Sequence, residues 1–541
     1  MSASSAEIPL RQRQLIAGMA GALLSLAVLL MPPPATLLGH PLGSQALALA
    51  RVAVLLLMPG LTLLRWVRPF DRLDDLQRLC LAPLVSLALM PLLLLWVGLT
   101  GSRWSAHGVQ AFLVACALRL IISLLRRWSR GRSTRSPRRA PARLWLSVGL
   151  VATFGAALAL RLAMIREMVY PAWVDSYQHT IITQIILDTG RVPTSYAPFH
   201  DLPGFVYHFG FHAWSAFVGW VTGLPAHQAV LWGGQVLNAL TVPGLFLLVD
   251  RLAGDRRAAL IAALIAGLFS RMPAYYVNWG RYPQLAGQVL LPVAVLATAE
   301  ALSTRRESWR AIPIAALLAG GLLLTHYRIA IFYLAAALVA LGAAWLRAAQ
   351  RPAGRARPLS WWQVLGRLAI IGALALLLAL PWLPDLVAKT LDTAQQVLAA
   401  SDGAQYDYIT LALVLDYGLR PVLLIALGAS VLWALLRARR RPLGLAIVVW
   451  LALIVFLANP RVSGLPSGFL TNGAVIMALY LPAALLIGQA TSDLYGLLQG
   501  KLRGRWRVAL SAALVIALLA LGGWGGYWLA RTGIEPWYQL V

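Results

Sequence analysis

The chain has 541 residues, of which 60% are hydrophobic and only 12% are charged, with 46 basic against 19 acidic side chains. A soluble domain is about a quarter charged and less than half apolar, so this composition excludes an ordinary soluble protein. The net charge of +27 does not indicate nucleic-acid binding, because the arginines lie in short segments between apolar runs, as in the cytoplasmic loops of membrane proteins. The two cysteines, Cys80 and Cys116, lie in apolar runs, which supports neither a disulfide framework nor a thiolate metal site.

Repeated apolar runs of roughly 17–22 residues are long enough to cross about 30 Å of hydrocarbon as helices. In lipid, a single open chain satisfies its backbone polar groups only as helices. We therefore predict an all-α integral membrane protein with roughly 15 transmembrane helices, within a range of about 13–16. The predicted spans are residues 15–30, 45–64, 79–99, 109–125, 144–162, 228–249, 257–271, 284–302, 311–325, 329–346, 366–385, 409–436, 443–459, 470–488 and 508–530.

The basic residues divide the chain into three regions and set its orientation. Residues 1–143 form an N-terminal four-span region that ends in a basic loop, 126–143, which we expect on the cytoplasmic side and in contact with anionic lipids. Residues 144–347 form a membrane core of catalytic type, and residues 348–541 form a C-terminal membrane region. The N-terminus is predicted to be cytoplasmic, which places the loop 166–227 and its interfacial helices on the extracytoplasmic face of the cell membrane.

The aromatic segment 205–224 is the ambiguous part of this topology. If it crosses the membrane, the five arginine-bearing loops that follow it all fall outside; if it is an interfacial or re-entrant helix, all five fall inside. The second interpretation obeys the positive-inside rule, so we favour it.

Ionisable side chains are concentrated between residues 173 and 212, beside hydrophobic segments where such groups are costly and mark functional sites. They are Asp175, His179, Asp188, Arg191, His200, Asp201, His208 and His212. Asp175 and His179 are four residues apart, on one face of a predicted surface helix that Gly190 ends, as expected of a carboxylate base tuned by an imidazole. The alternative is a capping box formed by Asp175 and Gln178.

His208 and His212 are also four residues apart, a spacing that suits a metal ion when a carboxylate joins the two imidazoles. The HExxH motif of zinc proteases is absent. We predict no metal ligands here, and the dependence on a divalent cation stays open. The alternative is a pair of interfacial histidines that form hydrogen bonds beneath an aromatic cap.

Two further segments combine arginine with aromatic and polar side chains at predicted outward corners. The first contains Asn278, Trp279, Arg281, Tyr282 and Gln284, and the second contains His326, Tyr327 and Arg328. The guanidinium group binds phosphate oxygens bidentately, so each corner suits a lipid-linked phosphate. The alternative is an aromatic belt whose arginines reach the lipid headgroups. The loop 385–416 is either a lid over an acceptor groove or a solvated loop.

At this point the pattern resembles the GT-C superfamily of polytopic membrane glycosyltransferases of the type that depends on polyprenyl-phosphate sugars. The resemblance rests on WVDSYQH at 173–179, YHFGFHAWSAFVGWVTGL at 207–224 and NWGRYPQLAG at 278–287, and it covers about residues 144–333. Many members of that superfamily have two adjacent acids in this loop, whereas Asp175 is followed here by Ser176.

The resemblance implies a glycosyltransferase that moves a sugar from a polyprenyl-phosphate donor to a glycan, lipid or protein acceptor, with inversion. It implies Asp175 as the general base with His179 as its catalytic partner. The implied donor-phosphate ligands are Arg281, Arg328, Tyr282 and His326, and the implied substrate contacts are His208, His212, Asn278 and Trp279. The resemblance fixes no cofactor and leaves a divalent cation open, and the other partners are membrane lipids rather than nucleic acid.

Two alternative functions remain. A transporter or flippase of lipid-linked glycans predicts ionisable residues within the spans and inverted repeats, and the sequence shows few of the former and no visible repeat. A polymerase or ligase of lipid-linked glycans uses the same substrates, and its expected mark is a large outward loop with several arginines.

Overall fold

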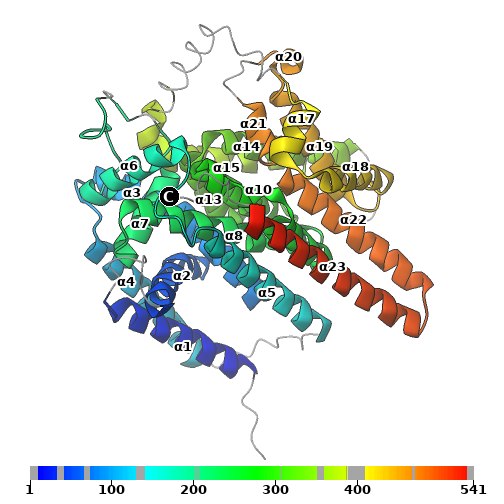
Figure 1. Ribbon diagram of the computed structural model, residues 1–541, viewed down its shortest axis with the longest axis horizontal. Coiled ribbons are helices and arrows are strands. Elements are labelled where there is room, and N and C mark those ends of the chain that lie inside the picture. Colours follow the sequence, from blue (N-terminus) through cyan, green and yellow to red (C-terminus); the bar gives the residue numbers. More distant parts are fainter. Residues whose placement is uncertain are drawn as a thin grey trace, which may run out of the picture.

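The protein is an all-α integral membrane protein, and the part of the chain described by the computed structural model contains no strand (Figure 1). The structure describes residues 10–32, 42–65, 73–129, 141–201, 204–205, 207–305, 307–349, 359–385, 387, 408–465 and 470–532. Most of the predicted loop 385–416 and the centre of the basic loop 126–143 therefore lie outside the described residues.

The helices follow one another along the chain with few long connections. They are α1 (Leu10–Leu30), α2 (Leu42–Leu64), α3 (Asp75–Leu99), α4 (Ala106–Ser129), α5 (Pro141–Met164), α6 (Val174–Thr189), α7 (Gly210–Thr222), α8 (Ala226–Leu252), α9 (Arg256–Leu264), η2 (Ile265–Phe269), α10 (Arg271–Ala274), α11 (Tyr276–Trp279), α12 (Tyr282–Ala301), η3 (Ser308–Ala311), α13 (Ile312–Thr325), α14 (Tyr327–Ala349), α15 (Trp361–Ala379), η4 (Leu380–Trp382), α17 (Leu411–Leu413), η6 (Val414–Gly418), α18 (Pro421–Leu436), α19 (Pro442–Leu457), α20 (Pro460–Ser463), α21 (Asn472–Ile476), α22 (Tyr480–Lys501) and α23 (Arg505–Thr532).

Among the described residues, 11 helices are long and apolar enough to cross a membrane, and the number becomes 12 if the bent pair formed by α17–η6 and α18 counts as one span. All 11 coincide with predicted spans. The expected count of about fifteen is higher because four predicted runs do not form long straight helices. Two of them are the apolar segments Leu15–Leu30, within α1, and Pro442–Leu457, which have fewer than 18 residues each.

The other two predicted runs are interrupted by breaks in the helix. The run 257–271 becomes the nine-residue α9 followed by the π-helix η2, and the chain turns extended at Ser270. The run 409–436 becomes η6 and α18, which meet at an angle of 114° across Leu419 and Arg420. Both breaks follow a π-helical turn, a distortion that often occurs at functional sites.

Helices α3, α8, α12 and α13 form the centre of the bundle, and α8 is the most enclosed, with 94% of its span buried. Helix α8 packs against α5, α9 and α12, while α13 packs against α3, α12 and α15. At the edge of the bundle, only 7% of the span of α23 is buried within the protein. In Figure 1, α22 and α23 extend together away from the end of the bundle where α6, α17 and α20 lie.

Several arginine-bearing loops meet at the end of the bundle opposite α6. Arg251 pairs with Glu300, and Arg256 pairs with Asp250 at 3.2 Å. Arg441 pairs with Asp493 at 2.7 Å. These contacts join α8 to the end of α12 and the start of α19 to α22, so loops that are distant in sequence share one end of the bundle.

Two arginines are buried within spans, which the sequence analysis did not identify. Arg51 in α2 donates to the carbonyl of Val221 at 2.7 Å and to those of Leu29 and Met31. Arg161 in α5 donates to Asn238 Oδ1 and to the Gly267 carbonyl, both at 2.8 Å. Both guanidinium groups thus satisfy carbonyl and amide oxygens of other helices, which is how a buried charge is retained in a membrane protein.

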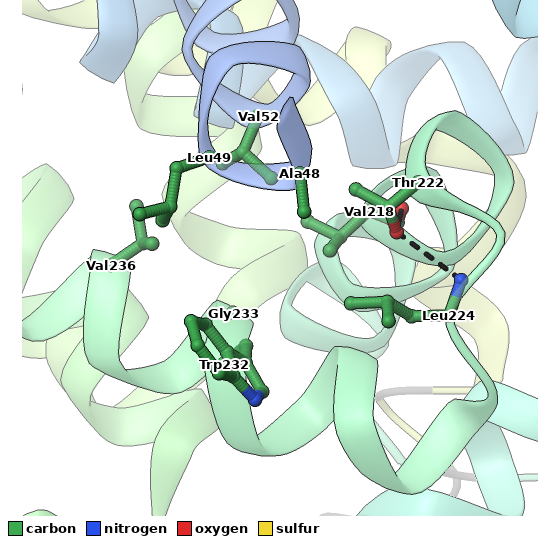
Figure 2. A pocket seen from close by; sticks show the side chains of 9 residues that line it. All are labelled: Ala48, Leu49, Val52, Val218, Thr222, Leu224, Trp232, Gly233 and Val236. Carbon is green, nitrogen blue, oxygen red and sulfur yellow. Dashed lines mark hydrogen bonds between the residues drawn. The ribbon is translucent and has the colours of Figure 1, made fainter. Parts of the chain in front are cut away.

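A small cavity lies between α2, α7 and α8 (Figure 2). Its lining residues are Ala48, Leu49, Val52, Val218, Thr222, Leu224, Trp232, Gly233 and Val236. The Thr222 hydroxyl is already used, because it donates to the Val218 carbonyl and accepts from the Leu224 N–H. This apolar cavity contains none of the predicted site residues.

Helices α6 and α7 are not among the described helices that are long and apolar enough to cross a membrane. Helix α7 has 13 residues, about 20 Å of helix, and nearly all of them are buried against α3, α4, α6 and α8. The placement of the segment 205–224 as an interfacial or re-entrant helix stays a prediction. Helix α6 ends at Gly190, whose φ of 70° is left-handed.

Gly190→Ala tests how tightly the end of α6 is held. An added Cβ would lie 2.2 Å from the Trp104 carbonyl oxygen, whereas a Cβ on Gly101, which also has positive φ (79°), would meet nothing within 4 Å. Both variants carry the cost of left-handed backbone, about 1–3 kcal/mol, but only Gly190→Ala must also displace the backbone of Trp104. Thermal unfolding in detergent should show the larger loss for Gly190→Ala, and equal losses would contradict this packing.

Candidate functional site

Helix α6 carries Asp175 in its first turn, at the end of the bundle away from the clustered arginine loops. Trp173 precedes the helix with φ 74° and ψ 158° and makes no side-chain capping bond. A backbone conformation this unusual for a residue other than glycine costs about 1–3 kcal/mol and is typical of functional sites. No side-chain cap bond forms at the start of α6, so the capping-box alternative for Asp175 and Gln178 does not hold.

The Asp175 carboxylate instead contacts an arginine from a distant part of the chain. Arg281 Nε donates to Asp175 Oδ2 at 3.2 Å, and the two side chains remain 46% and 41% exposed. An exposed ion pair of this kind contributes little stability. The contact places a carboxylate beside a guanidinium group at an accessible surface.

Gly280 makes this contact possible. Its φ is 57°, and an added Cβ would lie 1.8 Å from Ser176 Oγ. The loop between α11 and α12 therefore rests directly on the first turn of α6. The Arg281 guanidinium lies 5.5 Å from the centre of the Trp279 ring, a cation–π contact that helps to orient it.

Beneath Asp175 lies a layer of buried imidazoles and one half-buried phenol, from α6, α7, the segment before α7 and the turn between α13 and α14, which we call the histidine layer. Its members are His179, Tyr207, His208, His212 and His326. His179 Nδ1 and His212 Nε2 are 3.0 Å apart, and one of the two nitrogens carries the shared proton. His208 packs edge-on against His326 with ring centres 4.6 Å apart, so His208 and His212 face different partners.

Tyr207 lies at the centre of this layer. Its ring stacks on His208 at 4.0 Å between centres and approaches His179 at 5.9 Å. Burial raises the pKa of the Tyr207 phenol above its ordinary value, the charge of Asp175 raises it further, and Arg328 opposes them. Asp175 and Arg328 therefore both act on one half-buried ring, although they come from α6 and α14.

Three histidines of the layer, His179, His212 and His326, are neutral at physiological pH. Burial lowers the pKa of His179 from 6.5 to about 3. Burial and the neighbouring His179 hold the pKa of His212 well below its ordinary value. For His326 the pKa is lowered by burial first and then by Arg328, His179 and Arg281. Arg281 and Arg328 thus share an electrostatic neighbour, which brings both predicted phosphate ligands to one site.

The structure does not bring every predicted site residue to this surface. Tyr282 is fully buried, stacks on Phe211 and accepts a hydrogen bond from Gln235 Nε2 at 3.3 Å. Asn278 is 1% exposed and His326 is 5% exposed. These side chains support the loops that carry Arg281 and Arg328, and Trp279 is the half-buried member of the set.

Three residues at this end were not recognised from the sequence as parts of the site. Tyr207 and Trp173 lie next to predicted site residues, and Tyr417 belongs to the distant π-helix η6. Tyr417 is 38% exposed, and its ring centre lies 5.0 Å from that of Trp279. Its position depends on the bend between η6 and α18, which the sequence presents as one apolar run.

Among the residues that the structure describes, no group of three or more His, Cys, Asp or Glu side chains has the arrangement to hold a metal ion. His208 and His212 face His326 and His179 respectively rather than a shared carboxylate.

The histidine layer predicts an acid-sensitive fold. The pKa of His179 is about 3 when folded and 6.5 when unfolded, so the unfolded chain binds more protons below pH 6.5 and stability falls as the pH falls. Each pH unit below 6.5 costs about 1.4 kcal/mol for such a histidine. Melting temperatures measured from pH 7.5 to about pH 4.5 should fall less steeply for His179→Gln than for the wild type. His107→Gln, at an exposed position in α4, should keep the wild-type slope; an unchanged slope in His179→Gln would contradict the burial.

Several solved structures are similar to this protein. They include the Archaeoglobus fulgidus oligosaccharyltransferase in its apo form, with 15% identity, a TM-score of 0.48 and coverage of 71% of this chain and 55% of that chain. The archaeal oligosaccharyltransferase AglB from the same organism, in complex with an inhibitory peptide and a dolichol-phosphate, has 16% identity, a TM-score of 0.43 and coverage of 70% and 55%. The form tethered with an acceptor peptide containing the NVT sequon has 14% identity, a TM-score of 0.46 and coverage of 72% and 56%. This chain thus spans a little over half the length of those proteins.

No curated protein sequence matches the chain. Residues 53–533, which are most of its length, match a family described as a family of unknown function (DUF6541), and the chain belongs to that family.

Proposed function

We propose that this membrane protein is a glycosyltransferase that moves a sugar from a polyprenyl-phosphate donor to an acceptor hydroxyl, with Asp175 as the general base. The observation that carries the proposal is the contact of Asp175 with Arg281 at an accessible end of the bundle, with Arg328 beside the same histidine layer. A proton acceptor next to two phosphate-binding cations is the arrangement that transfer from a sugar phosphate needs.

In the proposed reaction, Asp175 accepts the proton of the acceptor hydroxyl as its oxygen attacks the anomeric carbon. The bond between that carbon and the phosphate oxygen breaks, and the phosphate leaves with the electron pair. Arg281 and Arg328 stabilise the negative charge that develops on the leaving phosphate. Attack from the side opposite the leaving group inverts the configuration of the anomeric carbon.

Because of this ion pair, the proposed reaction requires the donor to bind before Asp175 can act as the base. Without a donor, Arg281 occupies Asp175 Oδ2 and competes with the proton that the base must accept. A donor phosphate carries more negative charge than a carboxylate and binds the same guanidinium bidentately. Binding of the donor would therefore draw Arg281 away from Asp175, and the base becomes free only when the leaving group is in place.

His179 is a positioning residue in this scheme. It is buried, neutral and hydrogen-bonded to His212, so it does not reach the surface where Asp175 lies. One turn along α6 from Asp175, it fixes the rotation of the helix and hence the direction of the carboxylate. This differs from the catalytic partnership that the sequence suggested.

The side of the membrane follows from the charges at the two ends of the bundle. The loops with Arg251, Arg256 and Arg441 meet at the end opposite Asp175. Cytoplasmic loops carry an excess of arginine and lysine, so we place that end in the cytoplasm and the site on the extracytoplasmic face. A lipid-linked donor fits this location, because its chain stays in the membrane while its head group reaches the site.

A transporter would need ionisable groups along a path through the bundle. Of the arginines buried in the described spans, Arg51 and Arg161 instead hold carbonyl and amide oxygens that join helices. Their bonding is that of structural residues, and the accessible charged groups gather at one end. These observations favour the enzyme over the transporter.

Asp175→Asn tests the base directly. The amide cannot accept the proton, so transfer of radiolabelled sugar from a polyprenyl-phosphate donor by purified protein should fall about 100-fold or more. Asp188→Asn is the matched control, because Asp188 is an exposed acid on the same helix that accepts from Gln184 Nε2 at 2.8 Å. It should keep wild-type activity. Full activity in Asp175→Asn would remove the assignment of the base.

A further inference from the structure

Two other arginines lie near the site, and the proposed transfer does not use them. Arg271 begins α10, directly after the break that follows η2, and Arg420 precedes α18, directly after the break that follows η6. The two breaks bring these residues together, since α10 packs against η6. Burial lowers the pKa of Arg420, and the positive charge of Arg271 lowers it further, which shows that the two cations repel each other.

No carboxylate of the described residues compensates this pair. Arg271 Nη1 donates to the backbone carbonyl of Asp416, but neither guanidinium has an acidic oxygen within 4.0 Å among the residues that the structure describes, the exposed Asp416 included. Elsewhere in the described chain, partly buried cations such as Arg251 and Arg256 do have acidic partners. An anionic ligand would stabilise these two adjacent cations, which have no anionic partner among the described residues.

The arginines are held in place by aromatic rings rather than by charge. The Arg271 guanidinium lies 4.1 Å from the centre of the Tyr275 ring, and that of Arg420 lies 5.7 Å from the Trp524 ring. Arg420 also caps the N-terminus of the 16-residue α18, where the helix dipole adds positive potential. Both guanidinium groups lie over aromatic rings, and their remaining N–H groups are the donors through which we expect an oxyanion to bind.

A row of aromatic rings connects this pair to Asp175. Tyr275 contacts Trp279 with ring centres 5.4 Å apart, and Trp279 contacts Tyr417 at 5.0 Å. Trp279 also lies under Arg281, which contacts Asp175. The partly exposed faces of Trp279 and Tyr417 therefore lie between Asp175 on one side and, on the other, two cations that have no acidic partner among the described residues. The apolar C–H faces of a sugar ring pack well on such aromatic faces.

We propose that Arg271 and Arg420 form a second phosphate-binding site, separate from Arg281 and Arg328, and that the acceptor itself carries a phosphate ester. This inference rests on the proposed function. The acceptor phosphate binds Arg271 and Arg420, its sugar stacks on Trp279 and Tyr417, and its hydroxyl reaches Asp175. The protein then holds two phosphate-bearing ligands at once, and each has its own pair of arginines.

The test is the binding stoichiometry of radiolabelled farnesyl phosphate on the full-length protein in a neutral detergent, measured by equilibrium dialysis. The wild type should bind two molecules per chain. Arg271→Gln/Arg420→Gln should bind one, and Arg281→Gln/Arg328→Gln should also bind one, at the other site. Two molecules bound to Arg271→Gln/Arg420→Gln would overturn the proposal.

Control variants separate this effect from misfolding and from general loss of charge. Arg166→Gln removes an exposed arginine at the same end, where Arg166 pairs with Glu167 at 2.8 Å, and it should still bind two molecules. Arg420→Lys keeps the positive charge but loses the bidentate hydrogen bonding of the guanidinium group. It should retain the second site with an affinity lowered up to about tenfold. All variants should give the same single peak in size-exclusion chromatography as the wild type.

Competitors identify what the second site recognises. Farnesol has the same chain without the phosphate, and displacement by farnesol as effective as by farnesyl phosphate would overturn the proposal. Glucose 1-phosphate and inorganic phosphate distinguish the sources: if they displace the probe from the second site, the acceptor is a soluble phosphate ester, and if only farnesyl phosphate does so, the acceptor is lipid-linked. Either result supports phosphate recognition.

The binding experiment is independent of the transfer assay. Sugar transfer with one phosphate bound per chain would refute the second site and leave the proposed function intact. Two phosphates bound without transfer from any polyprenyl-phosphate donor would refute the proposed function and retain the site.

Discussion

The contact between Asp175 and Arg281 joins two parts of the chain that are 106 residues apart. It forms at a half-exposed surface where an ion pair adds little to stability, so the fold does not need it for cohesion. The surrounding structure nevertheless maintains it at some cost, with left-handed backbone at Trp173 and at Gly280 on either side. An unusual backbone conformation beside an accessible carboxylate is more typical of a functional site than of a segment that serves only packing.

Much of this site could be predicted because its chemistry is uncommon in such a sequence. Asp175, His179 and Arg281 are conspicuous among apolar residues, and the 11 long helices follow directly from runs of hydrophobic side chains. Tyr282 and Asn278 were predicted as site residues for the same reason, but both are buried. A polar side chain beside a predicted surface can instead point inward and form a hydrogen bond in the interior. Tyr282 does so with Gln235.

The second half of the site could not be predicted. Arg271, Arg420 and Tyr417 meet because two apolar runs break after π-helical turns and re-form in other directions. Hydrophobic periodicity does not reveal such breaks, since the side chains on both sides remain apolar. For the same reason the sequence suggested straight spans over residues 257–271 and 409–436, and their bends account for two of the spans that the structure does not contain.

Helix α7 starts against the end of α13, where an added Cβ on Gly210 would lie 2.6 Å from the Cα of Thr325. The ring contacts of the histidine layer continue from His326 through His208 and Tyr207 to His179. Protein interiors are close-packed and transmit displacement. A movement of the chain at His326, which precedes Arg328 by two residues, would therefore also move His179 and the helix that carries Asp175.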